Sequence, residues 1–98
     1  MLGRALKLIR RYHELTQEQL ADRLNLSKSF ISEIESENKR PSLEVIESYS
    51  KEFRISVSSI MIFAEQLETR TRANSVKSIV SRKVLAMLEA IDARSEPN

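Results

Sequence analysis

The chain has 98 residues and a mass of 11.3 kDa, which suits one domain and excludes an enzyme whose active site lies between two domains. It contains no cysteine, so disulfide frameworks, thiolate catalysis and cysteine-ligated zinc are excluded, and we expect a cytoplasmic protein. The 16 Lys and Arg and the 14 Asp and Glu leave a net charge of only +2. Any surface for nucleic acid must therefore come from the placement of charges rather than from their total.

Composition and hydrophobic periodicity predict an all-α protein, because one Gly and two Pro leave few turn formers. The first helix is predicted over 2–13 and the second over 17–24, where Thr16 and Gln19 form a capping box. The residues expected to point inward from these two helices are Leu2, Ala5, Leu6, Ile9, Tyr12, Leu20, Ala21 and Leu24. No apolar run approaches the roughly 20 residues needed to cross a bilayer, so we expect no membrane contact.

A tight break is predicted between the second helix and a third helix over 28–36. Asn25 tolerates the left-handed conformation, and Ser27 is a good N-cap. Ile31 and Ile34 fall on one side of the third helix, and the opposite side is short and polar.

Two further helices begin at the caps Ser42 and Ser56, and a last one is predicted over 74–93. Residues 66–72 have no clear stripe and are interpreted as a linker or a frayed helix end. The inward residues of the fourth and fifth helices are predicted to be Leu43, Ile46, Tyr49, Phe53, Val57, Ile60, Met61 and Ala64. This organisation predicts a first domain over 1–66 and a linker with a C-terminal helix over 67–98.

Enzyme chemistry has little support in this sequence. The single histidine, His13, falls at the end of the first helix, where a solvated or capping role is expected rather than a catalytic one. No phosphate-binding loop, zinc motif or calcium-loop spacing occurs. We therefore expect no catalytic residues, no metal and no cofactor.

The second and third helices instead have the geometry of a helix-turn-helix, whose second helix is narrow enough to enter a major groove of DNA. Lys and Ser on its outer face offer donors to bases and phosphates, and Glu33 offers an acceptor to a cytosine amino group. The capped helix starts at Thr16, Ser27 and Ser42 present backbone N–H groups that bind phosphate, and the loop 38–40 adds positive charge beside them.

These residues resemble the lambda-repressor-like (Cro/repressor, XRE-type) DNA-binding domain. The likeness covers about 2–64 and rests on the segments 15–21, 26–27, 31–35 and 41–44, which read LTQEQLA, LS, ISEIE and PSLE. The resemblance implies five helices with the third as recognition helix, binding to double-stranded operator DNA as a homodimer, and transcriptional control, most often repression.

The resemblance also implies roles for residues at matching positions. Arg10 and Glu35 match an internal ion pair between the first and third helices. The residues expected to contact bases are Lys28, Ser29, Ser32 and Glu33. Those expected to contact the DNA backbone are Gln17, Ser36, Asn38, Lys39, Arg40 and Ser42.

Three positions depart from the family pattern. Glu37 stands where the family usually has Gly, so either Asn38 takes the left-handed conformation or the loop is displaced. Asn25 replaces another common Gly with less strain. Lys28 stands where Gln often contacts adenine, so the family's base preference does not carry over.

A small DNA reader normally needs two copies on half-sites about one helical turn apart, so we expect a dimer surface. The alternative is that the last helix folds back on its own domain. The residues available for dimerisation are Ile62, Phe63, Val76, Val80, Val84, Met87, Leu88 and Ile91. An antitoxin or a restriction-controller protein, whose C-terminal helix binds a toxin or a polymerase subunit, is the rival interpretation.

Overall fold

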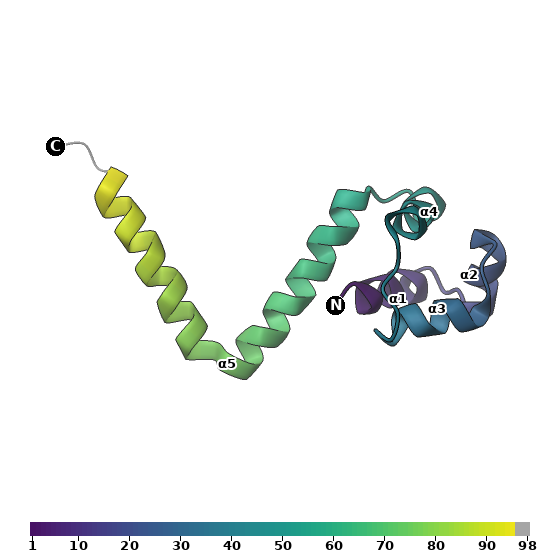
Figure 1. Ribbon diagram of the computed structural model, residues 1–98, viewed down its shortest axis with the longest axis horizontal. Coiled ribbons are helices and arrows are strands. Elements are labelled where there is room, and N and C mark those ends of the chain that lie inside the picture. The colour runs from purple at the N-terminus through teal and green to yellow at the C-terminus, as the bar shows by residue number, and fades with distance from the viewer. Residues whose placement is uncertain (96–98) are drawn as a thin grey trace. The chain divides into compact units, whose positions relative to one another are not determined.

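The computed structural model describes the backbone of residues 1–95 and the side chains of residues 1–71 and 84–91. As predicted, it is all-α, with five helices in the described part of the chain (Figure 1). They are α1 (Leu2–Tyr12), α2 (Gln17–Leu24), α3 (Lys28–Glu35), α4 (Leu43–Phe53) and α5 (Val57–Ser95). The bounds of the first three agree with the predicted ranges to within one residue.

The chain divides into two compact units, Met1–Leu67 and Glu68–Asn98. The first unit has one apolar core, and each of the five helices contributes to it. Its buried members are Leu6, Ile9, Leu20, Ala21, Ile31, Ile34, Ile46, Tyr49, Phe53 and Ile60. Because a fully buried aliphatic or aromatic side chain contributes about 1.5–3 kcal/mol, this cluster is the main source of stability for the first unit.

Four non-glycine residues in the left-handed conformation end or follow the short helices. Asn25 (φ 57°, ψ 44°) terminates α2, as predicted, and Arg54 (φ 55°, ψ 43°) terminates α4. The other two are Glu14 and Glu37. At each of these ends a backbone N–H bonds to a carbonyl five residues earlier, for example Leu26 N to Ala21 O at 2.9 Å. The satisfied carbonyls offset the cost of the left-handed backbone.

Gly3, the single glycine, does not form a turn; it lies where α1 contacts α3. A Cβ atom at this position would overlap the carbonyl oxygen of Ile34 and lie 3.1 Å from Oε1 of Glu37. The backbones of α1 and α3 can therefore approach as closely as they do only because residue 3 has no side chain.

Two sequence predictions about these elements are wrong. Residues 66–72 are helical and belong to α5, so the predicted linker and separate last helix form one helix over Val57–Ser95. Three residues assigned to inward stripes are exposed instead, namely Tyr12, Leu43 and Met61. Each lies at the margin of its helix's apolar stripe, where the packing of neighbouring helices decides whether a side chain is covered.

Across the part of the chain that the structure describes, no helix combines the length and the hydropathy of a membrane span.

Candidate nucleic-acid interface

The α2–turn–α3 unit is held by side-chain caps at the start of both helices. Thr16 Oγ1 accepts from Gln19 N (3.1 Å), and Gln19 Oε1 accepts from Thr16 N (2.9 Å), which is the predicted capping box. Ser27 Oγ accepts from Phe30 N (3.0 Å) at the start of α3. Because these caps specify both helix starts, the angle of α3 against α2 is set locally as well as by the core.

The outer face of α3 forms a shallow hollow of about 430 Å³. It is lined by Gln17, Lys28, Ser29, Ser32 and Glu33. The structure thus brings the four predicted base-contacting residues together with one predicted backbone contact. All four α3 residues are exposed, and the first turn of α3 has no acidic residue to neutralise the partial positive charge of the helix N-terminus. The hollow therefore offers hydrogen-bond donors at one end and a carboxylate acceptor at the other.

Lys39 lies over the outer edge of α3. Its Nζ is 3.8 Å from Oε2 of Glu33 and 5.1 Å from the centroid of the Phe30 ring. Both the amine and the carboxylate are half-exposed, so this pair is weak and its members are available to a ligand. The predicted phosphate contact Lys39 and the predicted base contact Glu33 are therefore neighbours in the free protein.

A buried ion pair fixes α3 on α1. Arg10 Nε donates to Glu35 Oε2 (2.7 Å) and Arg10 Nη2 donates to Glu35 Oε1 (2.9 Å), and the two residues are only 8% and 7% exposed. Arg10 Nη1 also donates to the carbonyl of Leu15 (2.6 Å). This bidentate geometry fixes the orientation of the two side chains as well as stabilising the pair, and it is the internal ion pair that the family resemblance implies.

Two further residues complete this buried polar cluster. Gln17 Nε2 donates to Oε1 of Glu35 at 3.1 Å, so one predicted DNA-backbone contact is held by the ion pair. Tyr49 lies in the core, and its hydroxyl has no hydrogen-bond partner among the described residues. Burial raises the pKa of the Tyr49 phenol above its ordinary value, and the negative charge of Glu35 adds to the rise. Tyr49 is therefore neutral throughout the physiological pH range.

The loop after α3 differs from both alternatives that the sequence left open at residue 37, where the family usually has Gly. We expected either a left-handed Asn38 or a displaced loop. Glu37 itself adopts the left-handed conformation, with φ 66°. Its N–H bonds to Ile34 O (3.1 Å), and the N–H of Asn38 bonds to Glu33 O (3.0 Å). The Glu37 carboxylate also accepts from the backbone N–H of Arg4 at 3.0 Å, in the first turn of α1. This bond to a helix N-terminus offsets the backbone strain, and the sequence reasoning missed it.

The other predicted phosphate contacts surround this loop. Asn38 and Arg40 are exposed, as is Ser36, whose Oγ donates to Glu33 O (3.2 Å). Ser42 Oγ accepts from Val45 N (3.2 Å) and caps α4 as predicted. The positive charges of Lys39 and Arg40 and the Ser42-capped start of α4 therefore all lie in the segment that follows the end of α3.

A helix-turn-helix family model matches residues 6–60, which is more than half of the chain. The chain belongs to the XRE-type helix-turn-helix family. This is a family of DNA-binding transcriptional regulators. The match covers α2, the turn, α3, the Arg10–Glu35 pair and the loop to α4.

Two curated relatives are named as repressors. The competence pilus inhibition repressor of Acinetobacter baylyi is 40% identical over 67 residues, which are 68% of this chain and 61% of that protein. The immunity repressor protein of Bacillus phage phi105 is 40% identical over 60 residues, which are 61% of this chain and 42% of that protein. The chain thus spans less than two thirds of the length of either repressor.

A solved structure supports the same fold. The clp gene regulator ClgR from Corynebacterium glutamicum superposes with a TM-score of 0.73 at 28% sequence identity, covering 81% of this chain and 84% of that chain. The agreement extends past the part that the family model matches, because 81% of 98 residues exceeds the span 6–60.

The residues predicted for dimerisation fall into three groups. Ile62 is 54% exposed, whereas Phe63 is partly buried against the core of the first unit. Val84, Met87, Leu88 and Ile91 are exposed, and so is Leu85, which the sequence reasoning did not include. The side chains of Val76 and Val80 lie outside the described residues.

Proposed function

We propose that this protein is a sequence-specific, double-stranded-DNA-binding transcriptional regulator that acts as a homodimer on a palindromic or pseudo-palindromic operator, most simply as a repressor. The hollow on α3 carries this proposal. It brings four exposed residues of α3, Lys28, Ser29, Ser32 and Glu33, together with Gln17 at the start of α2. The two relatives named as repressors support the direction of control.

The base contacts proposed here follow from side-chain chemistry. Lys28 donates to guanine or to a phosphate, Ser29 and Ser32 donate or accept, and Glu33 accepts from a cytosine amino group. The contacts proposed to hold the DNA backbone are Gln17, Ser36, Asn38, Lys39, Arg40 and Ser42. Because Glu33 and Glu37 offset part of this positive charge, we expect modest non-specific affinity, with selectivity coming from the bases.

Selection of bound sites from random double-stranded DNA, followed by gel-shift titration at two salt concentrations, tests the proposal. We expect one enriched site with two-fold symmetry and an affinity that falls steeply as salt rises, since counterions are released from the phosphates. A single unsymmetrical site would contradict the homodimer. Enrichment of no sequence would contradict sequence-specific binding altogether.

Substitutions on α3 and in the following loop should have different effects. Replacing Ser32 and Glu33 by Ala removes base contacts, so the preferred operator should change at those positions, by about 1–3 kcal/mol for each base pair affected. Arg40→Ala removes a phosphate contact, so all sequences should bind more weakly and the salt slope should fall by about one. Binding of both variants to a panel of single-base operator mutants measures the difference. The opposite pattern would mean that α3 is not the reading helix.

Ending the chain after Leu67 should separate folding from dimerisation. The first unit contains the whole buried core described above, so the fragment should fold and retain α-helical circular dichroism with cooperative unfolding. We expect it to be a monomer by light scattering and to bind a full operator at least about tenfold more weakly, because one half-site supplies too few contacts. A dimeric fragment would show that residues 68–98 are not the main interface.

A further inference from the structure

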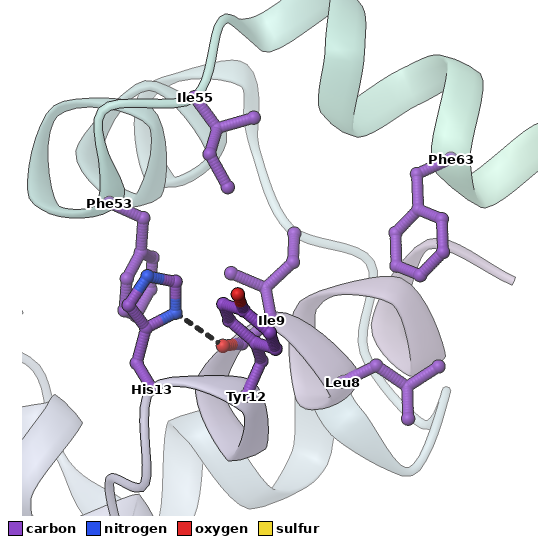
Figure 2. Close-up of a pocket in the computed structure, with 7 residues that line it drawn as sticks. All are labelled: Leu8, Ile9, Tyr12, His13, Phe53, Ile55 and Phe63. Atoms are coloured by element: carbon purple, nitrogen blue, oxygen red, sulfur yellow. Dashed lines mark hydrogen bonds between the residues drawn. The ribbon is translucent and has the colours of Figure 1, made fainter.

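An apolar groove opens on the first unit, away from the helix-turn-helix. It has a volume of about 560 Å³ and is lined by Leu8, Ile9, Tyr12, His13, Phe53, Ile55 and Phe63. Figure 2 shows Leu8 and Phe63 at one end, His13 and Phe53 at the other end, and Tyr12 and Ile9 between them. His13 is tied to the helix it terminates through Nδ1 and Ile9 O (2.8 Å), and its ring packs on Phe53 at 4.5 Å. The walls of the groove are therefore preformed.

One large side chain that lines this groove is exposed to solvent. Tyr12 is 83% exposed, although the sequence analysis expected it to point inward. Ile62, beside Phe63 on α5, is also exposed. A large aromatic side chain that lines an apolar groove and is nevertheless left in water is typical of a surface that another molecule covers.

The groove lies on the side of α1 that faces away from the recognition helix. Arg10 points towards α3, where it binds Glu35. Leu8 and Tyr12 each lie two residues from Arg10, which is about 200° around the helix. A molecule in the groove would therefore leave the hollow of α3 open to DNA.

The second unit carries an apolar face of the kind that fills such a groove. Val84, Leu88 and Ile91 follow the i, i+4, i+7 spacing of a helix that docks into a groove, and Leu85 and Met87 flank them. All five are exposed, at 49–64%. Glu89 is the one charged residue between positions 84 and 91, so this apolar segment carries a single negative charge.

The charged residues beside the groove are positive, opposite in sign to Glu89. Arg4, Lys7 and Arg11 share one exposed side of α1, next to Leu8 and Tyr12, and none of them forms an ion pair within the described part of the chain. α1 contains no acidic residue. A basic ridge along an apolar groove thus complements an apolar helix that carries a carboxylate.

We propose that residues 84–91 of one protomer dock in the groove of a second copy, with Val84, Leu88 and Ile91 among Leu8, Tyr12 and Phe63, and with Glu89 beside the basic ridge of α1. This rests on the homodimer of the proposed function and names the surface that receives the C-terminal helix. Two-fold symmetry makes the exchange reciprocal, so both grooves and both helical faces are covered in a closed dimer.

Cysteine cross-linking of the full-length chain tests the docking directly, because the natural sequence has no cysteine. Tyr12→Cys marks the groove and Leu88→Cys marks the helix. The two single variants are mixed under reducing conditions, left until their subunits have exchanged between dimers, and then oxidised. We expect a disulfide-linked pair of chains, one of each variant, at about tenfold or more the yield from either variant alone, because docking raises the effective concentration of the thiols.

A second pair, Arg11→Cys with Glu89→Cys, keeps every apolar contact and should cross-link in the same way. Glu18→Cys, on the exposed side of α2, replaces the groove variant as the matched control and should give no enrichment. Light scattering of each reduced variant establishes its oligomeric state before oxidation, and circular dichroism establishes that it is folded.

The outcomes separate the docking from the dimer. Efficient linking of Leu88→Cys to itself would show that the C-terminal helices pair with each other, which overturns the docking and keeps the homodimer. A chain that carries both Tyr12→Cys and Leu88→Cys and yields only internally linked monomers would also overturn the docking. So would a dimer that forms no cross-link either in the Tyr12→Cys and Leu88→Cys mixture or in the Arg11→Cys and Glu89→Cys mixture. A wild-type protein that is monomeric with and without operator DNA would overturn the homodimer itself.

Discussion

Replacing Glu35 by Ala is expected to lower the free energy of unfolding by about 3–5 kcal/mol, because it leaves the buried guanidinium of Arg10 without its charge partner. The side chains of this pair are 10% and 2% exposed, so water cannot substitute for the lost carboxylate. Gln17 Nε2 also loses its acceptor. Since a small domain has only about 5–15 kcal/mol of stability in total, the variant should be largely unfolded at modest denaturant concentration.

Urea unfolding followed by circular dichroism measures this effect, and the chain provides its own control. Arg23 Nη1 and Glu52 Oε2 form an exposed pair at 3.1 Å. Glu52→Ala removes the same type of ion pair from solvent-exposed surroundings and should cost no more than about 1 kcal/mol. The double variant Arg10→Met with Glu35→Leu, which removes both charges, should be more stable than Glu35→Ala. Equal losses for Glu35→Ala and Glu52→Ala would contradict the assignment of the buried pair as the anchor of α3.

Gly3→Ala is expected to destabilise the protein by about 1–3 kcal/mol, although the same exchange in an unpacked helix stabilises by about 0.5–1 kcal/mol. The sign is reversed because the new methyl group would overlap the backbone carbonyl oxygen of Ile34, which cannot rotate away as a side chain can. α1 must then move off α3 or shift along it. The bond from Arg4 N to Glu37 should also weaken, because it spans the same contact.

Thermal or denaturant unfolding of Gly3→Ala, compared with Lys7→Ala on the exposed side of α1, measures this prediction. Lys7→Ala should change stability by less than about 0.5 kcal/mol. Operator affinity should fall more for Gly3→Ala than its loss of stability alone accounts for, since the contact positions α3. A Gly3→Ala variant as stable as the natural chain would show that α1 and α3 do not approach as closely as described.

Much of the first unit follows from local sequence signals. Thr16, Ser27 and Ser42 mark helix starts because each side chain satisfies an N–H within its own turn, and the structure contains all three caps. Asn25 marks the turn because its preference for the left-handed backbone is intrinsic to the residue. The polar side of α3 was recognisable for the same reason, since the helical period alone places Lys28, Ser29, Ser32 and Glu33 opposite Ile31 and Ile34.

Other features depend on segments that are distant in the sequence. Glu37 takes a strained backbone because Arg4, 33 residues earlier, offers a free N–H to its carboxylate, and a local propensity scale contains no such term. Likewise, the segment 66–72 has no amphipathic stripe, and the sequence alone therefore indicates a linker or a frayed helix end. Its residues nevertheless continue the helix that begins at Val57, because propagation of an existing helix needs no new nucleus.

By itself, the sequence determined the helical class, the starts of the helices, the turn at Asn25 and the polar face of α3, since each depends on residues within one or two turns of each other. Only the tertiary structure decided that Gly3 lies against Ile34, that Tyr12 stays in water, and that Leu8, Phe53 and Phe63 meet around one groove. The reason is physical: periodicity specifies which side of a helix is apolar, but the neighbours that cover it are chosen by packing between elements that are far apart in the chain.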